Sequence, residues 1–241
     1  MAGRGDRSRT GPPQRGGRYG LLLVVLIGTY LFSAFNGTHL TTEGQIILFA
    51  LLLLLAMRSS PLPGWWPLVI CTVTVAGSAA AFGATLAGTQ GGAGAAELWK
   101  ALVLLMTAVV VVRRVLAKPT VTIQSIYGAL SAYLLIGLMF AACYAAIQHL
   151  GRTDFFVNHE PANAQTLQYF SFTTLTTLGY GDFTAAGSGG RSIAVMEALT
   201  GQVFLATLVA RLVSAYRAPD PREPRALPED VDGPGDDEDR D

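Results

Sequence analysis

Long apolar runs, almost free of charged residues, constrain the fold of this chain more than any other feature. A helix that crosses the roughly 30 Å hydrocarbon core of a bilayer needs about 20 mostly apolar residues. Four runs reach this length: 65–88, 98–116, 122–148 and 192–216. Two shorter runs, 20–35 and 45–57, either cross the bilayer twice or form a shallow hairpin. The sequence therefore predicts an all-α membrane protein with four leading transmembrane segments followed by two more helices.

Basic residues indicate how these segments are oriented. With the amino terminus in the cytoplasm, only Lys100, Arg152 and Arg191 of the 17 Lys and Arg residues fall outside. Cytoplasmic loops of membrane proteins carry an excess of Lys and Arg. We therefore expect a multi-pass protein of the plasma membrane, in a bacterial inner membrane, with both termini cytoplasmic. Residues 21–35 could also form a secretory signal, but no small-x-small cleavage site follows cleanly, which favours an uncleaved anchor.

The two ends of the chain differ in composition from the apolar middle. Residues 1–18 form a basic arm, and residues 217–241 form an acidic tail rich in Pro, Asp and Glu. Such segments bury too little apolar surface to fold, so we expect both to be disordered in the cytoplasm. Between them lie a four-segment transmembrane region, 19–118, and a second region, 121–216.

The segment from Thr176 to Asp182 lies between the last two apolar runs and reads Thr-Thr-Leu-Gly-Tyr-Gly-Asp. A dehydrated cation is stable where backbone carbonyl oxygens replace its hydration shell. Consecutive carbonyls can face one way only if alternate residues take dihedrals that most L-residues avoid, and Gly179 and Gly181 meet this need. The sequence therefore predicts a cation filter.

With this filter between two spanning helices, region 121–216 resembles the pore domain of tetrameric potassium channels, which have a valine at the position of Leu178. The resemblance implies an outer helix at 122–148, a pore helix at 162–176, a filter at 177–181 and an inner helix at 192–216. Potassium would bind the carbonyls of four residues and the hydroxyl of the first, with Gly181 closing the outer mouth. These four residues are Thr177, Leu178, Gly179 and Tyr180.

Other residues of this region are expected to support the filter. Tyr169 and Phe170 fall where the family has an aromatic cuff on its pore helix, Thr176 continues that helix into the filter, and Asp182 stands at the outer end. Thr173 departs from some bacterial members, which have a glutamate there, so their inactivation behaviour does not carry over. The resemblance further implies a homotetramer in the lipid bilayer, with potassium as permeant ion and no cofactor.

Two residues of the last run are gating candidates. Gly201 either permits the inner helix to bend or lets a neighbouring helix approach closely. Glu197 is an ionisable group inside a spanning segment, which marks a functional candidate. The alternative is a protonated or hydrogen-bonded carboxyl that ties the inner helix to the pore helix without a gating role. Thr200, Phe204, Leu208 and Arg211 share one helix face. That face either lines the pore or packs outward.

Voltage sensing is not predicted, because the fourth segment has no charge from 101 to 112 and lacks arginines at every third position. Three rival functions remain. A potassium uptake transporter would have several degenerate filters in one long chain. A regulatory membrane subunit would use the leading segments to bind a partner. An enzyme is disfavoured by the lack of nucleophile, paired carboxylates or metal cluster outside the apolar runs, and no nucleic-acid surface is present. An unidentified regulatory partner and the gating stimulus stay open.

Overall fold

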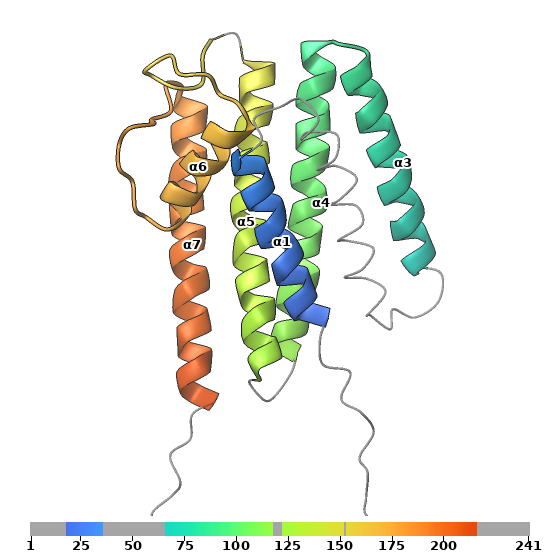
Figure 1. Ribbon diagram of the computed structural model, residues 1–241, viewed down its shortest axis with the longest axis vertical. Coiled ribbons are helices and arrows are strands. Elements are labelled where there is room, and N and C mark those ends of the chain that lie inside the picture. The colour runs from blue at the N-terminus through green and yellow to red at the C-terminus, as the bar shows by residue number, and fades with distance from the viewer. Residues whose placement is uncertain (1–17, 36–65, 118–121, 152, 216–241) are drawn as a thin grey trace, which may run out of the picture.

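The chain is described by a computed structural model, which covers residues 18–35, 66–117, 122–151 and 153–215. Within these ranges the protein is all-helical, with one isolated β-bridge between Phe156 and Ala185. The helices are α1 (Arg18–Phe35), α3 (Trp66–Leu86), α4 (Gln90–Ala117), α5 (Ile123–Leu150), α6 (Ala164–Leu175) and α7 (Ser188–Ala215). Five of them lie side by side along the long axis, whereas the short α6 sits between α5 and α7 (Figure 1). The second apolar run, 45–57, and both termini fall outside the described residues.

Three of the described helices are long and apolar enough to cross a membrane: α4, α5 and α7. The apolar stretches Tyr19–Leu31 in α1 and Thr72–Leu86 in α3 are shorter. The protein is therefore an all-α membrane protein, as the apolar runs predict. Helix α6, with 12 residues, spans about 18 Å at 1.5 Å per residue, which is too short to cross.

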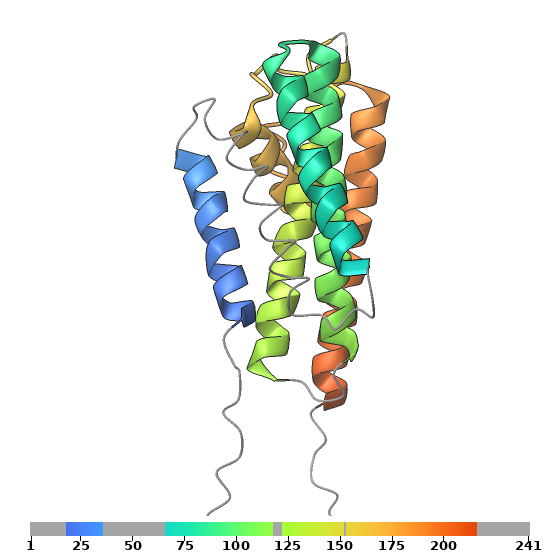
Figure 2. The ribbon, with the colours of Figure 1, turned by 90° about the vertical axis from the view of Figure 1, so that its right-hand side faces the viewer.

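The main core joins α1, α4 and α5. Leu26, Leu104, Val111, Ala132 and Leu135 are almost completely buried there. Helices α4 and α5 pack antiparallel along most of their length, and α1 lies along the other side of α5 (Figures 1 and 2). Near the end of α1, the Tyr30 ring meets Phe172 of α6 edge-on, with ring centroids 5.0 Å apart. The first segment thus contacts the helix that precedes the filter.

Helix α4 begins eight residues earlier than the predicted run at 98. The sequence before Leu98 is rich in glycine, so its hydropathy is low, but packing on α5 compensates. Gly94 faces Leu150, and a Cβ added at Gly94 would lie 2.7 Å from Leu150 Cδ2. Glu97 and Lys100 are both buried and form an ion pair with Nζ 2.5 Å from Oε2. Close packing and a paired charge thus extend the helix where apolarity alone would not.

The three helices of the predicted pore region have slightly different bounds from those expected. Helix α5 runs to 150 rather than 148, α6 covers 164–175 inside the expected 162–176, and α7 begins at 188 rather than 192. Helix α6 begins where Asn163 forms a capping box with Thr166, each side chain accepting from the other residue's backbone N–H at 3.0 Å. Its start is therefore fixed by local hydrogen bonds.

Candidate functional site

The segment after α6 has an alternating backbone. Thr177, Gly179 and Gly181 have φ values of 58°, 50° and 80°, while the intervening residues stay outside the left-handed region. Left-handed residues at every second position turn successive carbonyls toward one side of the chain. The two glycines of the sequence predicted this geometry. The left-handed conformation of Thr177 was not predicted, because positive φ is unusual for a β-branched residue.

The inner end of this segment is held by hydrogen bonds to α6 and α7. The N–H groups of Leu178 and Gly179 both donate to the carbonyl of Thr173, at 2.8 and 3.1 Å. The Thr177 hydroxyl donates to Thr176 O at 2.7 Å and accepts from Gln202 Nε2 at 3.2 Å. Gln202, on α7, therefore lies directly at the inner end of the filter segment.

The outer end is tied to the supporting helix through Asp182. The Tyr169 hydroxyl donates to Asp182 Oδ2 at 2.8 Å, and Asn158 Nδ2 donates to the Asp182 carbonyl at 3.0 Å. The bond to Asp182 raises the pKa of Tyr169, because a hydrogen bond to a carboxylate favours the protonated hydroxyl. The Tyr169 ring also packs edge-on against Phe183. These contacts brace the outer end from behind.

Phe170 and Thr176, the other two expected supports on α6 and its C-cap, make different contacts from Tyr169. Phe170 points away from the filter segment into an aromatic cluster with Tyr144, Phe155 and Phe156, where ring centroids lie 5.0 to 5.7 Å apart. Thr176 is the C-cap of α6, and its hydroxyl donates to Phe172 O at 2.7 Å. Phe170 thus anchors the outer loop on α6, while Thr176 shapes the entry into the filter segment.

Glu197 and Gly201 both face α6. Glu197 is 0% exposed, and its two carboxyl oxygens each lie 2.5 Å from a hydroxyl, Ser171 Oγ on α6 and Tyr144 Oη on α5. Gly201 packs against the last residue of α6, since a Cβ added there would lie 2.2 Å from Leu175 O. The structure therefore shows close packing at Gly201, while its role as a hinge stays a prediction.

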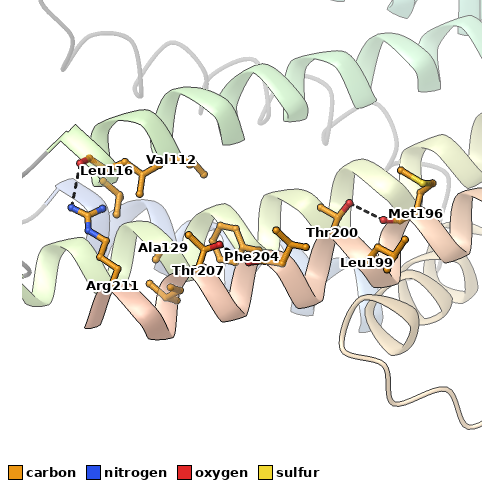
Figure 3. Close-up of a pocket in the computed structure, with 12 residues that line it drawn as sticks. Val112, Leu116, Ala129, Met196, Leu199, Thr200, Phe204, Thr207 and Arg211 are labelled. Carbon is orange, nitrogen blue, oxygen red and sulfur yellow. Dashed lines mark hydrogen bonds between the residues drawn. The ribbon is translucent and has the colours of Figure 1, made fainter. Parts of the chain in front are cut away.

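One face of α7, with Thr200, Phe204, Leu208 and Arg211, is turned toward α4 and α5 of the same chain. Together with Val112, Val115, Leu116 and Ala129, these residues line a groove of about 480 Å³. Figure 3 shows Thr200, Phe204 and Arg211 pointing into this groove, where Arg211 Nη2 donates to Leu116 O at 3.4 Å. The choice between lining the pore and packing outward stays a prediction. Gln202, on another face of the helix, is the residue of α7 that reaches the filter segment.

Comparison with known proteins places this geometry in a family. A family model described as "Ion channel" matches residues 130–218, which include α6, the filter segment and α7. Protein LctB of Bacillus caldotenax is 35% identical over 106 residues, covering 42% of this chain and 78% of that protein. The chain belongs to this ion channel family. No solved structure matches it significantly.

Membership of an ion channel family favours a non-enzymatic role and embedding in a membrane. Several residues of this site escaped the sequence analysis, among them Gln202, Tyr144 and Phe155. An amide inside an apolar run was a usable signal for Gln202, and the Phe155–Phe156 pair in a polar loop was one for the aromatic cluster. Tyr144 had no such signal, because a tyrosine near the end of a spanning helix also suits the membrane interface.

Proposed function

We propose that this chain is one subunit of a potassium-selective channel that conducts passively through backbone-carbonyl sites of a four-chain filter. The observation that carries the proposal is the alternating left-handed backbone at Thr177, Gly179 and Gly181. Such a backbone directs carbonyls of Thr177, Leu178, Gly179 and Tyr180 to one side, where they replace the hydration shell of potassium, the transported substrate. Because one chain supplies one wall of such a site, about four copies are needed to surround the ion.

Exposure of apolar side chains supports a homotetramer. In the single chain, Leu178 is 55% and Tyr180 68% exposed, although the segment that contains them is held by hydrogen bonds at both ends. Helix α7 also exposes large apolar residues on several faces, among them Val195, Val209 and Val213. Non-helical backbone at membrane depth is tolerated where protein or water surrounds it. Neighbouring copies of the chain would provide this cover.

The carboxyl end of α6 would stabilise a cation below the filter. A helix carboxyl terminus carries about half a negative charge, and α6 ends at Leu175, two residues before Thr177. The helix terminus therefore favours a cation waiting for entry into the filter.

The proposal includes the expected orientation, with the filter opening outward, both termini in the cytoplasm of the source cell, and little intrinsic voltage sensing. Arg113 and Arg114 are adjacent on the last turns of α4, so α4 carries no spaced row of charges that could move through the field.

Replacement of Gly179 tests the proposal. A Cβ at φ 50° costs roughly 1–2 kcal/mol per chain, which disfavours the left-handed backbone that aligns the carbonyls. We expect Gly179→Ala to abolish potassium flux into liposomes while the protein still assembles with the mass of four 25.5 kDa chains.

Gly187→Ala is the matched control, because Gly187 has an ordinary φ and no atom within 4 Å of an added Cβ. This variant should keep its flux. Potassium flux that is unchanged in Gly179→Ala would contradict the carbonyl filter. A tetramer without flux in the unmodified protein would favour a regulatory subunit instead.

A further inference from the structure

Glu197 lies at the point where three helices of the pore region meet. It belongs to α7, its Oε2 is reached by Tyr144 of α5, and its Oε1 is reached by Ser171 of α6. Glu197, Tyr144 and Ser171 are each 0% exposed. The carboxyl group therefore has no water to exchange with in this conformation, and its protonation must be consistent with these neighbours.

The number of hydrogens available for hydrogen bonding decides whether the Glu197 carboxyl group is neutral or ionised. The Ser171 oxygen lies 2.7 Å from Gly137 O and 2.5 Å from Glu197 Oε1, but a serine hydroxyl has a single hydrogen to donate. Gly137 O is a carbonyl and can only accept. If Ser171 donates to Gly137 O, the short contact with Glu197 needs a hydrogen on Oε1.

The neutral acid satisfies every contact. Its O–H donates to Ser171, Ser171 donates to Gly137 O, and Tyr144 donates to Oε2, so three hydrogens serve three contacts. An ionised Glu197 leaves two hydrogens for the same three contacts. One pair of oxygens would then face each other at hydrogen-bond distance with no hydrogen between them, which is repulsive.

Among the described residues, no ion pair compensates an ionised form. Lys100 pairs with Glu97, and the His159 ring contacts Asp154, but neither contact involves Glu197. The titratable side chains that interact with Glu197 are Tyr133, Cys143 and Tyr144, all on α5 and all uncharged in their protonated forms. An isolated buried carboxylate is far more costly than a hydrogen-bonded neutral acid.

We propose that Glu197 is held as a neutral carboxylic acid, and that its proton completes a hydrogen-bond chain that fixes the pore helix α6 between α5 and α7. Glu197 is thus a positioning residue for the filter. Its neighbour one turn along α7, Gly201, packs against Leu175, which is one turn along α6 from Ser171. Two successive turns of α6 therefore rest on two successive turns of α7, and the filter begins two residues beyond Leu175.

Infrared spectroscopy of the whole purified protein tests the protonation directly. At neutral pH we expect the carbonyl stretch of a protonated carboxyl group in the unmodified protein and its loss in Glu197→Gln. Glu160→Gln, which replaces an exposed glutamate of the outer loop, is the matched control and should retain the band. Identical spectra of the unmodified protein and Glu197→Gln in this region would overturn the proposal.

The positioning role rests on the proposed function and is tested by potassium flux. Glu197→Gln keeps the three contacts of the neutral acid, because an amide N–H donates to Ser171 and the amide oxygen accepts from Tyr144, so flux should stay within about twofold of the unmodified protein. Ser171→Ala breaks the chain, because it removes the hydroxyl that bonds both Gly137 O and Glu197 Oε1, and we expect flux to fall by about tenfold or more. Loss of flux in Glu197→Gln with an intact tetramer would overturn the neutral acid.

The infrared band and the potassium flux test the neutral Glu197 and the proposed channel function separately. If the unmodified protein conducts nothing, the proposed function fails, yet the infrared band still decides whether Glu197 is neutral. If the protein conducts and the band is absent, the neutral acid fails while the channel stands.

Discussion

Thr177 shows that the filter conformation is imposed by its surroundings as well as by glycine. A left-handed β-branched residue stores about 1–3 kcal/mol of strain, and Thr177 has φ 58°. Its hydroxyl bonds to Thr176 O and Gln202, while the next two N–H groups converge on Thr173 O. These contacts hold the residue in place. The sequence shows where glycine relaxes the backbone, but it does not show where neighbours strain it.

Tyr169 offers a prediction at the residue scale. Its hydrogen bond to Asp182 raises the pKa of Tyr169 above the ordinary 10.0. A raised pKa in the folded state means that the bond contributes stability below the ordinary pKa and loses it as pH rises through the folded-state value. In an alkaline titration followed by tyrosinate absorbance, Tyr169 should ionise later than an ordinary tyrosine.

The variants Tyr169→Phe and Asp182→Asn isolate this group. The difference between the unmodified protein and Tyr169→Phe should show a single titration above pH 10. In the Asp182→Asn background, the titration midpoint obtained from the same comparison should shift back toward the ordinary tyrosine pKa. A Tyr169 titration that is the same with and without Asp182 would show that this bond does not form in solution.

At the scale of elements, the sequence predicts which segments form helices better than it predicts where these helices end or what they contact. The apolar runs at 65–88 and 122–148 correspond to α3 and α5 within two residues, because a long apolar run predicts a membrane helix. The start of α4 was misplaced because packing of Gly94 on Leu150 decides it. The sequence allowed a protonated or hydrogen-bonded Glu197 that ties α7 to α6, but its partners Ser171 and Tyr144 were out of reach, since they depend on how three helices pack.

The substitution Gly201→Ala distinguishes close packing at this position from free hinge motion, because the two predict opposite changes in the stability of the protein. An added Cβ would meet Leu175 O at 2.2 Å, and overpacking of this kind costs about 1–3 kcal/mol. We therefore expect Gly201→Ala to lower the thermal unfolding midpoint of the purified protein. If Gly201 served only as a hinge, alanine would instead stabilise the helix by about 1 kcal/mol.

Gly83→Ala provides the control for this measurement. Gly83 lies inside α3, is exposed, and has no atom within 4 Å of an added Cβ. This substitution should leave the midpoint unchanged or raise it slightly. A higher midpoint in Gly201→Ala as well would show that the contact with Leu175 yields without cost.

At the scale of the whole molecule, helices α1 and α4 pack on helices of the predicted pore region. Helix α1 packs on α5 and reaches α6 through Tyr30 and Phe172, while α4 packs on α5 over most of its length. The sequence separated a four-segment region from a pore region, and that division stays a prediction about domains. Helix α1 contacts α6 directly, and α4 is connected to α6 through α5.

The reversal potential of purified protein in a planar bilayer, with potassium on one side and sodium on the other, tests the central claim most directly. Carbonyl sites that replace the hydration shell of potassium predict a reversal close to the potassium equilibrium potential, and an open probability that depends little on voltage. Current that reverses near zero would mean a pore that does not select potassium, and would contradict the account.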